Sequence, residues 1–167
     1  FEEGIGLTAI FDGTFENCAK LTSIAIPKNV ESIGVRAFYD CGSLETLSIA
    51  SDSLLKEIKS YGFYNCTKLS SIAMPKSVET VEAYAFGSCT AISSLTFGTG
   101  FDAEIKKIGD YAFNGSDISV LDFGKYSKLD YIGAYAFSTC SKATKRILPN
   151  HPLDIKLNAF NGCSSVD

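Results

Sequence analysis

The chain of 167 residues is poor in the residue types on which most catalytic and metal sites depend. It has one histidine, one methionine and no tryptophan. His151 stands between Asn150 and Pro152, with no serine or cysteine nucleophile at a recognisable spacing, and neither a phosphate-binding loop nor a dinucleotide-binding fingerprint occurs. Because catalysis needs several converging groups, we expect no enzymatic activity, no cofactor and no metal site.

Long runs of one charge and long apolar runs are also missing. The chain has 15 basic and 19 acidic residues, for a net charge of -4, and its densest basic stretch is the pair Lys106 and Lys107. A nucleic-acid partner is therefore not expected. The longest apolar stretches have a few residues, against the ~20 that span a bilayer, so no membrane span is expected either.

A repeat dominates what is present. Seven phenylalanines recur at intervals of 23 to 27 residues, and an isoleucine or valine stands five positions before each of them. The phenylalanines are Phe15, Phe38, Phe63, Phe86, Phe113, Phe137 and Phe160. A period in this range predicts a solenoid, in which each coil buries its apolar face against its neighbours.

Two copies, Leu21–Cys41 and Leu69–Cys89, align without a gap and indicate the path of one coil. Apolar and polar residues alternate towards the end of Leu21–Ile26, which predicts a short strand. Val30–Gly34 reads as a second short extended piece, and the apolar residues of Ala37–Leu44 are three apart, which predicts a helical or 3₁₀ turn. We therefore predict an α/β repeat solenoid with parallel strands stacked ~4.8 Å apart.

The pattern L-x-x-I-x-I-P-x-x-V-x-x-I-G-x-x-A-F-x-x-C resembles the BspA-type leucine-rich repeat, from about Ile10 to Val166. The resemblance implies a right-handed leucine-rich-repeat coil of about seven repeats, forming one domain over residues 1–167. Because no capping segment follows the last turn, and solenoids need caps, we expect this domain to be part of a longer chain.

The same resemblance implies a function. Such repeats occur in surface and secreted proteins of bacteria and some protozoan parasites, which implies a location at the cell surface or outside the cell. It further implies adhesion or host interaction through a protein partner, such as an extracellular-matrix or host glycoprotein. The family has no shared active site, and the pattern fixes neither the ligand nor the oligomeric state.

Six cysteines follow the repeat, each three residues after a repeat phenylalanine: Cys18, Cys41, Cys66, Cys89, Cys140 and Cys163. This register predicts one inward column of free, buried thiols. Side chains stacked in parallel rarely reach the torsion of a disulfide, and no pair has the spacing of a zinc site.

A tyrosine recurs two residues before the phenylalanine in four consecutive coils, and Arg36 takes that place in the coil before. The tyrosines are Tyr61, Tyr84, Tyr111 and Tyr135. Tyrosine is enriched at interfaces because its ring is large and stiff and its hydroxyl tolerates water. A partner-binding stripe and a ladder that only stabilises the stack are both consistent with this pattern.

Two further surfaces are candidates. The outward positions of the predicted strands are small and nearly uncharged, which fits either a binding sheet or a solvated face without anchors. The longer connections 50–57 and 98–107 fall at equivalent places, and insertions often mark the binding side. Phe101 in the second connection is either an exposed anchor or a side chain tucked over the core.

The leading hypothesis is a cell-surface or secreted protein-binding module. A structural spacer that presents another domain, and an intracellular interaction scaffold, are the alternatives. An export signal upstream would exclude the scaffold, and a spacer would show no binding of its own.

Overall fold

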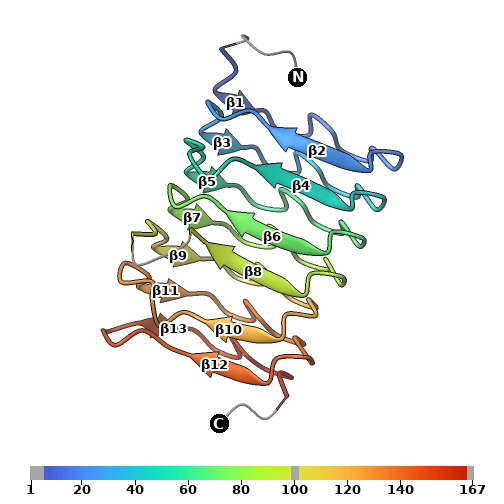
Figure 1. Ribbon diagram of the computed structural model, residues 1–167. Helices are drawn as coiled ribbons and strands as arrows, with labels where there is room; N and C mark the ends of the chain where they lie inside the picture. Colours follow the sequence, from blue (N-terminus) through green and yellow to red (C-terminus); the bar gives the residue numbers. More distant parts are fainter. Residues whose placement is uncertain (1–5, 99–101, 165–167) are drawn as a thin grey trace.

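The computed structural model describes residues 6–98 and 102–164, which form a solenoid whose coils stack along one axis (Figure 1). On one side, two-residue strands form a continuous seven-stranded parallel sheet. These strands are β1 (Ala9–Ile10), β3 (Ser32–Ile33), β5 (Glu57–Ile58), β7 (Thr80–Val81), β9 (Lys107–Ile108), β11 (Tyr131–Ile132) and β13 (Asp154–Ile155). The isoleucine or valine that precedes each repeat phenylalanine pairs with its equivalent in the next coil, as the spacing predicts.

The other side of the solenoid, here called the strand face, carries longer strands (Figure 1). They are β2 (Ser23–Ile26), β4 (Thr46–Ile49), β6 (Ser71–Met74), β8 (Ser94–Phe97), β10 (Val120–Asp122) and β12 (Lys145–Ile147). They pair in parallel as β2 with β4, β6 with β8, and β10 with β12. Within the described residues no ladder joins β4 to β6 or β8 to β10. The strand face therefore consists of three two-stranded sheets.

Tyr126 bridges the break between β8 and β10. Its hydroxyl accepts a hydrogen bond from the backbone N–H of Phe97 at 3.1 Å, and the two rings meet edge to face at 5.6 Å. A buried N–H without a partner would destabilise the fold. The phenol therefore replaces the partner that a continuous ladder would supply.

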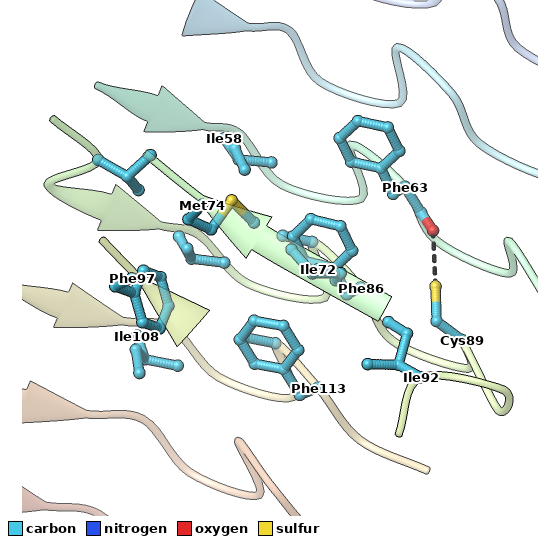
Figure 2. Packing of buried hydrophobic residues seen from close by; sticks show 14 of the residues in the cluster. Ile58, Phe63, Ile72, Met74, Phe86, Cys89, Ile92, Phe97, Ile108 and Phe113 are labelled. Carbon is cyan, nitrogen blue, oxygen red and sulfur yellow. Dashed lines mark hydrogen bonds between the residues drawn. The ribbon is translucent and has the colours of Figure 1, made fainter. Parts of the chain in front are cut away.

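The core lies between the two sets of strands and is filled from both (Figure 2). In β6, Ile72 and Met74 are buried while Ser71 and Ala73 are exposed, as the alternation predicts. The repeat phenylalanines form one continuous stack, with centroids 4.7 to 5.6 Å apart and planes within 10° of parallel. The prediction of a leucine-rich-repeat solenoid of short parallel strands is confirmed.

The expectation of a helical or 3₁₀ turn in each coil is wrong, because the described residues contain no helix. The segment instead makes consecutive turns, such as the one closed by the N–H of Cys41 and the carbonyl of Phe38 at 3.4 Å. Arg36 and Asp40 take left-handed backbone conformations, with φ of 56° and 57°. Every second N–H then points to the next coil, as when Phe38 donates to the carbonyl of Gly62 at 2.7 Å. A helix would keep these donors within one coil.

Small residues bring the coils close together. The residue before each repeat phenylalanine is buried from the second coil to the last: Ala37, Gly62, Ala85, Ala112, Ala136 and Ala159. Glycines after the short strands approach the previous coil even more closely. A Cβ added to Gly133 would lie 2.4 Å from the backbone nitrogen of Asp110, which is closer than real contacts allow.

The cysteines form the predicted column of free thiols. Cys41, Cys66, Cys89 and Cys140 are buried, whereas Cys18 and Cys163 at the two ends are half-buried. The thiol of Cys89 donates to the carbonyl of Phe63 in the preceding coil at 3.0 Å (Figure 2). Burial, together with the neighbouring Cys66, raises the pKa of Cys41 to about 12. Such protonated, enclosed thiols are inert.

Candidate functional site

The four tyrosines predicted to align are in contact with one another. Tyr61, Tyr84, Tyr111 and Tyr135 are all half-buried. Their rings stack face to face, with centroids 4.8, 4.6 and 4.8 Å apart along the series and planes within 9° of parallel. We call this row the Tyr stripe. Each ring thus covers the faces of its neighbours and leaves part of its surface to solvent.

The backbone beneath the Tyr stripe is unusual for tyrosine. All four residues have φ between 56° and 60°, in the left-handed region. Glycine and asparagine enter this region readily, whereas bulky residues do so at a cost in free energy. The first coil has Gly13 and the last has Asn158 at the same place, with φ of 63° and 58°. The turn therefore accepts residues without a ring.

Two tyrosines that the sequence analysis did not select extend the stripe. Tyr39 and Tyr64 each stand directly after a repeat phenylalanine, and their rings stack 5.2 Å apart. The ring of Tyr64 meets Tyr61 edge-on at 5.5 Å and Tyr84 at 6.3 Å. A tyrosine directly after the repeat phenylalanine in two successive coils is a pattern in the sequence that could have identified them. The Tyr stripe with Tyr39 and Tyr64 is hereafter the Tyr surface.

Gly87 makes room for one of these rings. It takes the place of Tyr64 in the next coil, and a Cβ on it would lie 3.1 Å from a ring carbon of Tyr64. A side chain at Gly87 would push that ring aside. The shape of the Tyr surface therefore depends on a residue that adds no side chain to it.

Polar groups hold the two ends of the Tyr surface. The guanidinium of Arg36 lies 4.2 Å from the ring centroid of Tyr39 and forms an ion pair of 2.7 Å with Glu16. At the other end, the side-chain amide of Asn158 donates to the hydroxyl of Tyr135 at 2.7 Å. Arg36, a candidate from the sequence, thus belongs to the surface as a capping group on an aromatic face.

The surroundings of Tyr84 favour the neutral form of its phenol. Partial burial raises the pKa of Tyr84, and the neighbouring phenols of Tyr111 and Tyr61 and the carboxylate of Asp110 raise it further. The phenol of Tyr84 is therefore neutral at physiological pH. It offers a hydroxyl that can both donate and accept a hydrogen bond.

The strand face is exposed, as predicted, and bears small side chains along β2, β4, β6 and β8. A depression of about 150 Å³ opens on it where β4 and β6 are unpaired. Its lining includes Ile49, Met74 and Pro75. The depression is the size of a small apolar group, but it presents no aromatic or arginine anchor.

The edge that carries the longer connections is organised by ion pairs. Lys28 pairs with Asp52 at 3.2 Å, and Lys76 pairs with Asp102 at 3.1 Å, in each case between neighbouring coils. All four side chains are more than half exposed, so these pairs add little stability. Phe101 lies outside the described residues, and its candidacy as an anchor stays a prediction.

Within residues 6–98 and 102–164, no group of three or more histidine, cysteine or acidic side chains is arranged to hold a metal ion. In the same part of the chain, no helix has the length and apolar character to cross a bilayer. The side chains gathered at the Tyr surface are phenols, one guanidinium and carboxylates. This set suits hydrogen bonding and aromatic contact rather than covalent chemistry.

Comparison with solved structures places the fold among bacterial leucine-rich repeat proteins. The leucine rich repeat protein of T. pallidum is 22% identical over 99% of this chain and 74% of its own, with a TM-score of 0.81. A leucine rich cell surface protein of Faecalibacterium prausnitzii is 24% identical over 90% and 43% of the two chains, with a TM-score of 0.58. The pneumococcal vaccine antigen PcpA is 26% identical over 90% and 44%, with a TM-score of 0.59.

At the level of sequence, no curated protein matches the chain. The profile of the BspA type leucine rich repeat region does match, in six copies, over residues 8–125 and 56–167. These residues contain the stacked phenylalanines, the paired short strands and the Tyr surface. The chain therefore belongs to the BspA-type leucine-rich repeat family.

Proposed function

We propose that the chain is a non-enzymatic protein-binding module, secreted or displayed at a cell surface, that acts in adhesion or host interaction through its Tyr surface. The observation that carries this proposal is the continuous contact of six tyrosine rings on the turns, four of them on left-handed backbone. The family supports it, because leucine-rich repeat domains generally bind other proteins.

Preorganisation is the physical reason why this surface suits binding. Side chains that are ordered only on binding lose rotamer freedom, which weakens the complex. The rings of the Tyr stripe are already fixed by mutual stacking, with planes within 9° of parallel. Tyrosine is also among the residues that dominate binding energy at protein interfaces.

The proposed location rests on the same family resemblance. The pneumococcal neighbour is named as a vaccine antigen. This supports display outside the cell for the present chain. Localisation by antibody labelling of intact cells tests it directly, and labelling only after permeabilisation would favour the intracellular scaffold.

The test of binding is a surface plasmon resonance screen of the purified chain against extracellular-matrix and plasma glycoproteins, at low and physiological salt. We expect at least one saturable partner. The double variant Tyr84→Asn with Tyr111→Asn should bind it about tenfold more weakly or worse, because two central rings are removed while the turn keeps a residue that it accepts.

Ala73→Glu is the matched control on the strand face, since Ala73 is exposed and lines the depression there. It should leave the affinity unchanged. Loss of binding with Ala73→Glu but not with the tyrosine variant would move the site to the strand face. No binding by a folded, monomeric chain would favour the structural spacer.

A further inference from the structure

The stacked geometry of the Tyr surface restricts what a partner can contact. Inner rings such as Tyr84 and Tyr111 lie only 4.6 Å from each other and nearly parallel, so their faces are covered by neighbouring rings. A flat sugar or proline ring therefore has no free inner face to stack on. What remains for a partner is the row of ring edges and hydroxyl groups. No residue in the described part of the chain hydrogen-bonds the hydroxyl of Tyr61, Tyr84 or Tyr111.

A carboxylate borders this row, since the charge of Asp110 acts on the phenol of Tyr84. Asp110 directly precedes Tyr111 and is exposed. One oxygen of Asp110 accepts the N–H of Ala134 at 2.9 Å. The carboxylate forms no ion pair within residues 6–98 and 102–164. Its negative charge is therefore available to a partner.

Two cations near the Tyr surface, Arg36 and Lys156, are held in ion pairs. Arg36 pairs with Glu16 at 2.7 Å. Lys59, two residues before Tyr61, forms no ion pair within the described residues. Its charge acts on the neighbouring carboxyl group of Glu57, whose pKa is raised overall by burial. The Tyr surface presents hydroxyl and carboxylate oxygens, which are complementary to a donor-rich cation.

Arg36 shows within the molecule how this surface holds such a cation. Its guanidinium lies against an aromatic ring, 4.2 Å from the centroid of Tyr39, while a carboxylate of the adjacent coil binds it from the side. A guanidinium has five N–H donors in one plane. It can bridge oxygens on neighbouring coils, which are ~4.8 Å apart, and a compact ammonium group does so less well.

We infer that the segment recognised by the Tyr surface is a basic protein segment that carries arginine, and that Asp110 binds its guanidinium group beside the tyrosine hydroxyls. This inference rests on the proposed function and names the chemistry of its partner. Electrostatic complementarity of this kind sets specificity and speeds association, and it weakens as the salt concentration rises.

The test is a selection of random peptides displayed on phage, carried out with the whole chain. Peptides are selected on the wild type and then depleted on the Tyr84→Asn, Tyr111→Asn double variant, so that only peptides dependent on the Tyr surface remain. We expect these peptides to be enriched in arginine over the starting library. Arg→Gln substitution in a synthesised peptide should weaken its binding about tenfold or more.

Asp110→Asn then tests the role assigned to the carboxylate. Asparagine keeps an oxygen for the N–H of Ala134 and removes only the charge. We expect about fivefold weaker binding or worse, with a smaller dependence on salt. Asp122→Asn is the matched control, because Asp122 is exposed, lies on the strand face and also accepts a backbone N–H, that of Gly124 at 3.1 Å.

The outcomes separate the two proposals. Tyrosine-dependent peptides that are acidic or apolar would overturn the basic partner and leave the proposed function standing. If Asp122→Asn weakened peptide binding as much as Asp110→Asn, that result would also overturn the basic partner. The absence of any tyrosine-dependent peptide would overturn binding through the Tyr surface, and the inference with it.

Discussion

The rings of Tyr84 and Tyr111 stack 4.6 Å apart with 3° between their planes, although both residues hold a left-handed backbone, with φ of 57° and 56°. Asn158 takes the same place in the last coil without a ring. The stack is thus a property of the side chains that the turn tolerates but does not require. Substitutions there can change the surface while the coil keeps its path.

Stability should distinguish two substitutions of Tyr84. Tyr84→Asn loses two stacked contacts, worth ~0.5–1.5 kcal/mol each, but relieves left-handed strain of about 1 kcal/mol. We expect a net change in the free energy of unfolding of about 1–2 kcal/mol or less. Tyr84→Ala loses the same contacts without that relief and should be the less stable of the two. Urea unfolding measures the stability of both variants. Equal stabilities would show that left-handed backbone strain at this position does not affect the free energy of unfolding.

The phenylalanine stack should respond according to position. Phe86 is fully buried between Phe63 and Phe113, so Phe86→Ala leaves a cavity and should cost ~3–5 kcal/mol. Phe15 is half-buried in the first coil, so Phe15→Ala should cost clearly less. Chemical denaturation measures the difference, with the same dependence of the free energy of unfolding on denaturant concentration for both variants. Equal losses would mean that the coils do not share one continuous core.

Close approach of the coils makes a second set of substitutions informative. A Cβ on Gly133 would lie 2.4 Å from a backbone atom, so Gly133→Ala should cost about 1–3 kcal/mol through displacement of the coil. Gly42→Ala is the control, since its Cβ would meet only Thr67, at 3.9 Å. Thermal unfolding of both variants decides the matter, and a stable Gly133→Ala protein would contradict the close contact.

Thiol reactivity should depend on pH at one end of the cysteine column. A hydrogen bond from Cys140 and the positive charge of Arg146 lower the pKa of Cys163 to about 7. Because the thiolate is the nucleophile, modification of Cys163 should accelerate as the pH rises through 7, well below the ordinary thiol value of 9.0. Cys41, with a pKa of about 12, stays protonated across this range.

The measurement is the rate of reaction with a chromogenic disulfide reagent between pH 5 and pH 9, on native and unfolded protein. Cys163→Ser should remove the fast phase and leave the buried thiols, such as Cys66, slow until the chain unfolds. Because Cys18 is also half-buried, the rates are compared in a Cys18→Ser background. There, a fast phase that persists in Cys163→Ser, or that appears only near pH 9, would contradict the lowered pKa.

Much of the fold was predictable because it is periodic. The spacing of the phenylalanines places Phe63, Phe86 and Phe113 in one stack, and alternation places Ile72 inside and Ser71 outside. Such patterns are local and repeat in every coil, so they can be read without coordinates. The alignment of the four tyrosines, and the free state of the thiols, follow from the same register.

The path of the turn was not predictable from spacing. Apolar residues three apart fit a helical turn and a series of tight turns equally well. Hydrogen bonds between coils select the second, because Phe38 donates to Gly62, 24 residues further along the chain. The same holds for the contacts of Tyr39 with Tyr61 and Tyr64, and for the break in pairing that Tyr126 bridges. These features depend on contacts between residues more than 20 positions apart, which only the stacked coils bring together.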